Sequence, residues 1–315
     1  MATYLISGGG GFIGSNIAEE LLRRGDDVRV LDDFSTGRRE NLAHADAWAK
    51  QGGAEFRLIE GDIRDEATRN GAVAGAEFVI HTAAVPSVQR SVENPAHSND
   101  VNVNGTLGML IAARDHGVQR FVFSSSSSLY GESEVLPKVE TMRADPISPY
   151  GLQKLAGETY CRLFHRLYGM PTVALRYFNV FGPRQDPGSE YSAVIPRFIA
   201  AVQSDRPPTV YGDGEQTRDF TFVANVVRAN LLACEAGPAA LGGAYNIGCG
   251  DRISLNDLLR ALGELVGREV RADHAAPRAG DIKHSLADIG LAADRLGYEP
   301  AVELLEGLKR TVEAS

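Results

Sequence analysis

A run of four glycines after a short apolar segment restricts the fold of this 315-residue chain more than any other feature. In ISGGGGFIGSNIAEELLRRG the run lies between a strand-like segment, 3–7, and an amphipathic helical pattern, 12–24. Two spacings fit, Gly9-x-Gly11-x-x-Gly14 and Gly8-x-x-Gly11-x-x-Gly14. Either would let backbone N–H groups approach a pyrophosphate at the helix start. An ordinary strand-to-helix turn also uses glycine, so the run predicts a dinucleotide site only in a suitable context.

That context is an alternation of short apolar runs and longer helical patterns through the first half of the chain. The strand-like runs are 3–7, 27–32, 55–60, 77–82, 120–125 and 172–178, and the helical patterns include 12–24, 96–116 and 150–168. Alternation of this kind favours right-handed crossovers and a parallel sheet covered by helices on both faces. We therefore predict an α/β fold with a doubly wound, Rossmann-type sheet.

The second half has a different texture, with Pro and Gly clusters at 182–188 and 207–214 and helical patterns at 193–203, 222–235 and 254–266. We predict an NAD-binding domain over 1–178, with a returning segment near 216–247, and a smaller, partly interleaved α/β lobe over 179–315 that binds the substrate.

An acidic side chain ends the second predicted strand, in VLDDF. Asp32 at this position can accept hydrogen bonds from a ribose 2′-hydroxyl and would repel a 2′-phosphate, so we predict NAD as the cofactor. The alternative role for Asp32 is to cap a loop. Arg38 and Arg39 follow closely and could serve NADP instead. Asp62, after the third strand, is placed to meet the adenine edge or to cap a helix.

Tyr150 and Lys154 lie four residues apart in SPYGLQK, which puts them on one face of a predicted helix. Free tyrosine has a pKa of about 10 and is a poor base at neutral pH. A nearby ammonium and the positive nicotinamide ring would favour the phenolate. The alternative is a surface Tyr and Lys packed side by side. A serine from the run Ser124 to Ser128, at the end of the fifth strand, is expected in the same pocket, and spacing alone does not identify which one.

Charge and cysteine content restrict the partners. The formal net charge is −9 without a long basic run, which argues against nucleic acid or an anionic membrane surface. Cys161, Cys234 and Cys249 are widely separated and have no metal-ligand spacing, so we expect free thiols, no metal and a reducing cytoplasm. We also expect neither a signal peptide nor a membrane span.

Several longer motifs, taken with these features, resemble the extended short-chain dehydrogenase/reductase family, and within it the UDP-sugar 4-epimerases. The resemblance covers essentially the whole chain, and its motifs are specific only in combination. They are HTAAVPSVQRSVENP (81–95), NVNGT (102–106), FSSSSSLYG (123–131), YGLQK (150–154), RYFNVFGPRQ (176–185), GDGEQTRDF (212–220) and PRAGDIKHSLADI (277–289).

The resemblance implies a role for particular residues. Ser126 matches the catalytic hydroxyl, Tyr150 the base and Lys154 the residue that holds the nicotinamide ribose. The implied cofactor contacts are Gly8, Gly11, Phe12, Ile13, Gly14, Asp32, Asp33, Ser35, Thr36, Gly37, Asp62, Ile63, Ala83, Ala84, Asn102, Tyr150, Lys154 and Tyr177. The implied substrate contacts are Ser87, Ser126, Asn179, Val194, Tyr211, Arg218, Arg278, Asp281 and Ser285, with Arg218 and Arg278 as clamps on the UDP.

The implied reaction is C4 epimerisation of a UDP-sugar through a transient 4-keto intermediate, with no net redox change. Relatives that eliminate water or carbon dioxide carry an acid just before the YG motif, where this chain has Ser127, Ser128 and Leu129. Ser285 matches a position that is bulky in epimerases restricted to UDP-glucose and UDP-galactose. We therefore expect activity on UDP-GlcNAc and UDP-GalNAc, and activity on the non-acetylated pair stays open.

Three alternatives stay open: an epimerase restricted to non-acetylated sugars, a UDP-glucuronate 4-epimerase, and a redox-inactive NAD-binding scaffold on the same fold. The resemblance also implies a homodimer built through the helices near 96–116 and 150–168. Their apolar faces are equally compatible with packing on the sheet.

Overall fold

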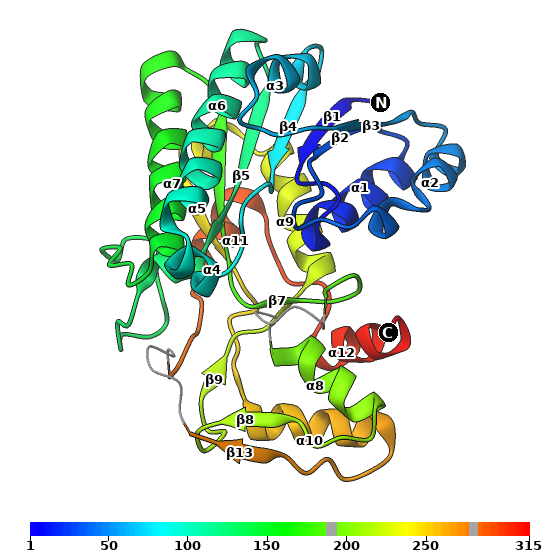
Figure 1. The fold of residues 1–315 in the computed structure, drawn as a ribbon. Helices are drawn as coiled ribbons and strands as arrows, with labels where there is room; N and C mark the ends of the chain where they lie inside the picture. Colours follow the sequence, from blue (N-terminus) through cyan, green and yellow to red (C-terminus); the bar gives the residue numbers. More distant parts are fainter. Residues whose placement is uncertain (187–193, 277–282) are drawn as a thin grey trace.

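The computed structural model describes residues 1–186, 194–276 and 283–315 (Figure 1). At its centre lies a seven-stranded sheet in the order β11-β6-β5-β4-β1-β2-β3, in which all neighbouring strands are parallel. The strands are β1 (Thr3–Ser7), β2 (Asp27–Asp32), β3 (Phe56–Glu60), β4 (Phe78–His81), β5 (Arg120–Ser126), β6 (Thr172–Tyr177) and β11 (Ala244–Ile247). The predicted doubly wound α/β fold is confirmed.

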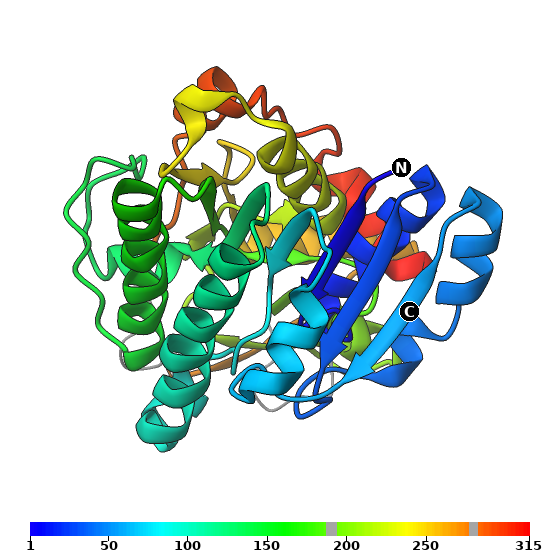
Figure 2. The same cartoon turned by 90° about the horizontal axis from the view of Figure 1, so that it is seen from above.

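Helices cover both faces of this sheet, as the view from above shows (Figure 2). One face carries α1 (Phe12–Arg24), α2 (Ala45–Gly52), α9 (Val223–Glu235) and α11 (Gly290–Leu296), and the other carries α3 (Glu66–Val73), α6 (Thr106–Asp115) and α7 (Pro149–Tyr168). Successive strand residues point to opposite faces. Ile6 is fully buried in the core on the first face, and its neighbour Leu5 is fully buried in the core on the second.

The segment between β4 and α6 departs from the single helix predicted over 96–116. It consists of α4 (Val88–Glu93), α5 (Pro95–Asn99) and a π-helical turn over Asp100–Gly105, which runs directly into α6. The apolar periodicity of the sequence does not reveal this wider turn. Asn102, within it, and Thr106, which follows it, are both buried. Turns of this kind occur frequently at functional sites.

A smaller lobe lies below the sheet in Figure 1. Its elements are β7 (Val180–Phe181), α8 (Val194–Gln203), β8 (Thr209–Tyr211), β9 (Thr217–Arg218), β10 (Thr221–Phe222), β12 (Ile253–Ser254), α10 (Leu255–Val266), β13 (Asp273–Ala275) and α12 (Leu304–Glu313). The strands pair as β10-β7, β12-β9 and β13-β8 around a core that includes Phe181, Phe198 and Leu258. The chain returns from this lobe to the sheet through α9 and β11.

Short 3-10 helices cover Arg39–Leu42, Ser127–Tyr130 and Pro238–Ala240. The three cysteines are unpaired, and two of them, Cys161 and Cys234, are buried. Within the described ranges, no helix is long and apolar enough to cross a membrane.

Candidate active site

The glycine turn closes tightly against the end of β4. Gly8 has a φ of 77°, and a Cβ on it would lie 2.5 Å from the backbone nitrogen of Ala83. A Cβ on Gly14 would lie 2.4 Å from the carbonyl oxygen of Gly8. A side chain at either position would force the turn apart. The helix α1 begins at Phe12 with no side-chain cap and no acid in its first turn, so its N–H groups can meet an anion.

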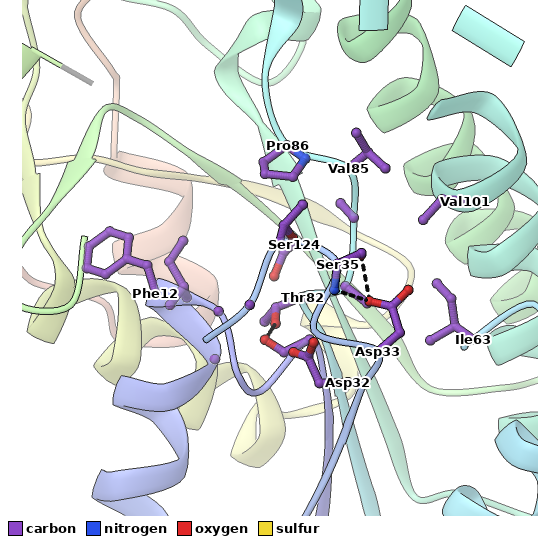
Figure 3. Close-up of a pocket in the computed structure, with 18 of the residues that line it drawn as sticks. Phe12, Asp32, Asp33, Ser35, Ile63, Thr82, Val85, Pro86, Val101 and Ser124 are labelled. Carbon is purple, nitrogen blue, oxygen red and sulfur yellow. Dashed lines mark hydrogen bonds between the residues drawn. The ribbon is translucent and has the colours of Figure 1, made fainter. Parts of the chain in front are cut away.

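A cavity opens beside this turn, at the carboxyl ends of β1, β2, β4 and β5 (Figure 3). Ligands of open parallel sheets bind at this end of the strands. The predicted cofactor contacts that line the cavity are Gly8, Gly11, Phe12, Ile13, Gly14, Asp32, Asp33, Ser35, Thr36, Gly37, Asp62, Ile63, Ala83, Ala84, Tyr150, Lys154 and Tyr177. Asn102 is not among the lining residues. It lies behind the cavity, where its amide bonds the backbone of Val85.

The cavity wall also contains residues that the sequence prediction missed. They are Leu31, Gly61, Thr82, Val85, Pro86 and Val101. Most are immediate neighbours of predicted contacts. They could have been predicted by assigning the whole segment at the end of strands 2, 3 and 4 to the cavity wall. Ser124 and Ser125, from the serine run that was expected in this pocket, also line it.

Asp32, the last residue of β2, has both carboxylate oxygens bonded to the backbone. Its Oδ2 accepts a 2.8 Å hydrogen bond from the Gly10 N–H, and its Oδ1 accepts one of 2.8 Å from Phe34. Asp32 therefore fixes the glycine turn, and each oxygen keeps a second lone pair for a ribose hydroxyl. Burial raises the pKa of Asp32. Asp33 lies beside it and accepts from the N–H and hydroxyl of Ser35.

The two arginines that could have served NADP are both paired with carboxylates. Arg38 contacts Asp186 at 2.6 Å, and Arg39 contacts Glu60 at 2.5 Å while its guanidinium lies 4.2 Å from the Phe34 ring centre. Together with Asp32, this arrangement favours an unphosphorylated ribose.

The predicted catalytic pair occupies the first turns of α7. Lys154 donates a 2.7 Å hydrogen bond from Nζ to the carbonyl oxygen of Ser124, and Nζ lies 5.7 Å from the centre of the Tyr150 ring. Burial lowers the pKa of Lys154 to about 8 and raises that of Tyr150 to about 12, although a hydrogen bond with Ser126 opposes the rise. The residues alone therefore keep the phenol protonated at neutral pH, and the expected lowering of its pKa requires the positive ring of bound NAD⁺.

The serine run distributes three hydroxyls over three partners. Ser124 Oγ lies 3.1 Å from the Tyr177 hydroxyl, Ser125 donates to Glu158, and Ser126 Oγ accepts from the N–H and the hydroxyl of Ser128. Ser126 is also the member of the run whose hydroxyl lowers the pKa of the Tyr150 phenol. Its position at the last residue of β5 brings it near that phenol.

Glu158 and Arg176 form an ion pair behind the serine run. The Arg176 guanidinium contacts Glu158 Oε1 at 2.5 Å, with side-chain exposures of 7% and 12%, and it also donates to the Tyr130 hydroxyl. Tyr130 in turn donates to Asn246 on β11. The ion pair therefore connects α7, β6 and the segment just after β5, and holds Ser125 from behind.

A second cavity lies in the smaller lobe between α8, β7, β8 and β9. Four predicted substrate contacts line it: Asn179, Val194, Tyr211 and Arg218. Its remaining wall, which the sequence prediction missed, consists of Val180, Phe181, Ile195, Arg197, Phe198, Thr209, Gln216, Phe220 and Leu255. The backbone of Asn179 has a φ of 30°, and its amide nitrogen donates to the carbonyl oxygen of Asp219.

Other predicted substrate contacts do not line this cavity. Ser87 caps the start of α4, where its hydroxyl accepts from the Arg90 N–H, and its φ of 98° is strained. Ser285 donates its backbone N–H to Thr217, next to Arg218. Arg278 and Asp281 lie outside the described residues.

The sequence pattern of the NAD dependent epimerase/dehydratase family matches residues 4–248. A UDP-glucose 4-epimerase from Mycolicibacterium smegmatis is 39% identical over 312 residues, covering 98% of this chain and 97% of that protein. The structure of a UDP-N-acetylglucosamine 4-epimerase from Methanobrevibacter ruminantium M1, in complex with UDP-N-acetylmuramic acid, superposes with a TM-score of 0.93 at 37% identity, covering 99% and 97% of the two chains.

A third similar structure contains the cofactor. It is a UDP-glucuronic acid 4-epimerase from Bacillus cereus in complex with UDP-glucuronic acid and NAD, with a TM-score of 0.89, 31% identity, and 99% and 98% coverage. The chain belongs to the NAD-dependent epimerase/dehydratase family, and within it to the UDP-sugar 4-epimerases. Its cofactor is NAD, which the glycine turn, the uncapped start of α1 and Asp32 are suited to hold.

Proposed function

We propose that this enzyme interconverts UDP-GlcNAc and UDP-GalNAc, and also accepts UDP-Glc and UDP-Gal. The observation that carries the proposal is the small side chain of Ser285 on a segment that runs from the substrate cavity towards the catalytic residues. The Ser285 N–H donates to Thr217, beside Arg218. Two residues later, Ala287 packs in one cluster with Leu129 and Tyr130, just after the serine run.

A sugar attached to UDP in the second cavity would have to pass this segment to reach Tyr150. Serine leaves room for a C2 acetamido group, whereas a tyrosine would fill that space. Because pockets exclude a larger group mainly through steric cost, one side chain at this position can decide between acetylated and plain sugars.

Tyr150 is proposed to take the proton of the C4 hydroxyl and later to return it to the same oxygen. When bound, the cofactor would supply the hydride acceptor as NAD⁺ and, once reduced, the hydride donor to the opposite face of C4. Ser126 hydrogen-bonds the phenol and can share the moving proton. Lys154 holds its ammonium near the phenol through its bond to Ser124, which favours the phenolate form.

Elimination and decarboxylation are disfavoured by the distribution of acids. The acids that line the cofactor cavity are Asp32, Asp33 and Asp62, all after β2 and β3, at the adenosine side. Glu158 lies behind the serine run, but its carboxylate is bonded to Arg176 and Ser125. No carboxylate among the described lining residues is therefore placed beside Tyr150.

The test is to incubate the purified enzyme separately with UDP-GlcNAc, UDP-Glc and UDP-glucuronic acid, and to detect C4 epimers by NMR. We expect turnover of the first two. Ser285→Tyr should lower kcat/KM for UDP-GlcNAc by roughly 10- to 100-fold, the effect of overpacking a site, and should spare UDP-Glc. Ser285→Ala is the matched control and should keep both activities. Turnover of UDP-glucuronic acid alone, or an unaffected Ser285→Tyr variant, would refute the assignment.

We further propose that two copies of the chain associate through α4 and α7. These packed helices expose apolar side chains at helical spacing: Val88 and Val92 on α4, and Leu152, Leu163 and Leu167 on α7 are 38–65% exposed. A second copy is the partner that would cover such a face with an identical one. Light scattering should give the mass of a dimer, and Leu167→Glu should give that of a monomer.

A further inference from the structure

A buried chain of hydrogen bonds passes behind the cofactor cavity and joins three of its sides. Its members, here named the His81 network, are Ser7, His81, Thr106, Asn102 and Gln153, and each is at most 3% exposed. Ser7 Oγ lies 2.6 Å from His81 Nδ1, and Thr106 Oγ1 lies 2.9 Å from His81 Nε2.

The direction of these bonds follows from the far end of the chain. The Thr106 hydroxyl donates to the carbonyl oxygen of Asn102 at 2.7 Å, so it must accept from His81 Nε2–H. The Nδ1 atom is then the acceptor of a hydrogen bond that the Ser7 hydroxyl donates. Burial and the nearby charge of Lys154 lower the pKa of His81 to about 3, so the imidazole stays neutral and keeps this single arrangement.

The network continues to the catalytic helix. The Asn102 amide nitrogen donates at 2.8 Å to Gln153 Oε1, and Gln153 Nε2 donates at 2.9 Å to Ser98 Oγ. The π-helical turn that carries Asn102 is thereby fixed to α7. The π-helical turn places the side chain of Asn102 within hydrogen-bonding distance of both Val85 and Gln153.

Members of the network stand directly behind lining residues of the cavity. Ser7 precedes Gly8, His81 precedes Thr82, Asn102 follows Val101, and Gln153 precedes Lys154. His81 itself does not line the cavity, and both of its ring nitrogens are bonded, so it has no free atom for acid–base chemistry.

We propose that His81 is a positioning residue that joins the glycine turn on β1 to the π-helical turn and α7, and thereby keeps the two walls of the NAD cavity at the correct separation. Through Asn102 and Gln153 it sets where Lys154 stands relative to Gly8. The inference rests on the NAD site and is independent of which UDP-sugar is the substrate.

The chain offers a matched pair of variants for the test. Thr106 and Thr172 are both fully or almost fully buried, and each donates its hydroxyl to a carbonyl oxygen of a neighbouring segment, Thr172 to Cys161 at 2.8 Å. Thr106 also accepts from His81, whereas Thr172 lies outside the network. Thr172→Val should therefore lower Tm, and Thr106→Val should lower it further, because it also leaves the buried His81 Nε2–H without an acceptor.

The decisive readout is the rate at which bound NAD⁺ in the holoenzyme exchanges with isotope-labelled NAD⁺. Thr106→Val should accelerate exchange about tenfold, as expected for loss of one buried hydrogen bond that supports the site, and Thr172→Val should leave it at the wild-type rate. Ser7→Ala should resemble Thr106→Val. Because Ser7→Ala and Thr106→Val both act through His81, bound NAD⁺ should exchange in the double variant no faster than in the faster of the two single variants.

Equal exchange in Thr106→Val and Thr172→Val would overturn the proposal, because His81 would then only stabilise the fold. A double variant whose acceleration equals the product of the two single effects would also overturn it. His81→Phe should match the double variant, and if it does not fold, the hydroxyl variants still decide. Absence of epimerase activity on every UDP-sugar would refute the proposed function but would leave the exchange result unaffected.

Discussion

The cofactor cavity is formed by the carboxyl ends of four strands in one parallel sheet, whereas the second cavity lies among strands of two or three residues in the smaller lobe. Around the first, polar side chains such as His81, Asn102, Gln153 and Lys154 are almost fully buried and bond to one another or to the backbone. Around the second, Arg218 and Tyr211 are partly exposed.

This difference indicates that the two regions have different roles. A sheet with interlocking buried bonds holds the reacting groups at fixed positions, because moving one group leaves several polar atoms unpaired. A lobe of short strands can exchange a side chain at low cost. We therefore expect variants around the cofactor cavity to change chemistry or folding, and variants in the lobe to change substrate affinity.

The largest effect is expected from Tyr150→Phe. Removing the proton-transferring hydroxyl should lower kcat by about 10³-fold, within the usual range for loss of a general acid–base group, and should leave bound NAD in place. Tyr160→Phe, on the same helix, is the matched control and should retain full activity. A similar loss in both variants would mean that α7 is sensitive to any such change rather than to the loss of this phenol.

Breaking the ion pair behind the serine run should lower the stability of the whole domain rather than slow the chemical step directly. Glu158→Gln leaves the buried Arg176 charge without its partner, and the free energy of unfolding should fall by about 3 to 5 kcal/mol. Urea denaturation measures this loss. The surface pair Arg310–Glu306 provides the control, because Glu306→Gln should change stability by less than about 1 kcal/mol.

Substitutions in the smaller lobe should change the KM for UDP-sugars rather than kcat. Arg218 lines the second cavity and has backbone partners in Thr217 and Lys283. Arg218→Met should raise KM for UDP-sugars by roughly 10- to 100-fold, the effect of losing a charge-assisted hydrogen bond, with little change in kcat or Tm. Arg260→Met, on the exposed side of α10, should leave KM unchanged. A fall in kcat without a rise in KM would contradict the difference in roles between the two regions.

A smaller, pH-dependent effect is expected at Asp219, which joins the two regions. Its carboxylate accepts from the N–H groups of Cys249, Gly250 and Ala287, and burial raises its pKa to about 6. A raised pKa means that the folded state binds more protons than the unfolded state between about pH 4 and 6. The contribution of Asp219 to the free energy of unfolding should therefore become more favourable as the pH falls through 6. Above pH 6, where the buried carboxyl is ionised, its contribution should be unfavourable.

Asp219→Asn removes this titration. The stability of the wild type relative to that of Asp219→Asn should rise by up to about 3 kcal/mol between pH 7 and pH 4, since each pH unit over which the extra proton is bound contributes about 1.4 kcal/mol. Denaturation curves of both proteins across this range measure the difference. A constant difference would show that Asp219 has an ordinary pKa.

The sequence predicted the sheet well because strand and helix periodicities are local signals. Alternating apolar runs identified β1 to β6, and the glycine turn located the start of α1. The π-helical turn over Asp100–Gly105 escaped prediction, because the pattern of 96–116 was interpreted as one regular helix.

Contacts between distant segments were harder to predict. Nothing near Glu158 in the sequence indicates Arg176 as its partner, and the His81 network joins five separate positions of the chain. Asn102 was expected to touch the cofactor because it belongs to the NVNGT motif, but its side chain is committed to Val85 and Gln153. A motif indicates that a residue has a role at the site, and only the fold shows which neighbouring groups its side chain contacts.

The proposed reaction requires that the hydrogen that leaves C4 of the sugar returns to the same carbon without exchanging with water. The direct test uses UDP-GlcNAc labelled with deuterium at C4, incubated with the enzyme in ordinary water and analysed by NMR and mass spectrometry. We predict a C4 epimer that keeps the deuterium at C4. Loss of the label to solvent, or its appearance at another carbon, would contradict the account.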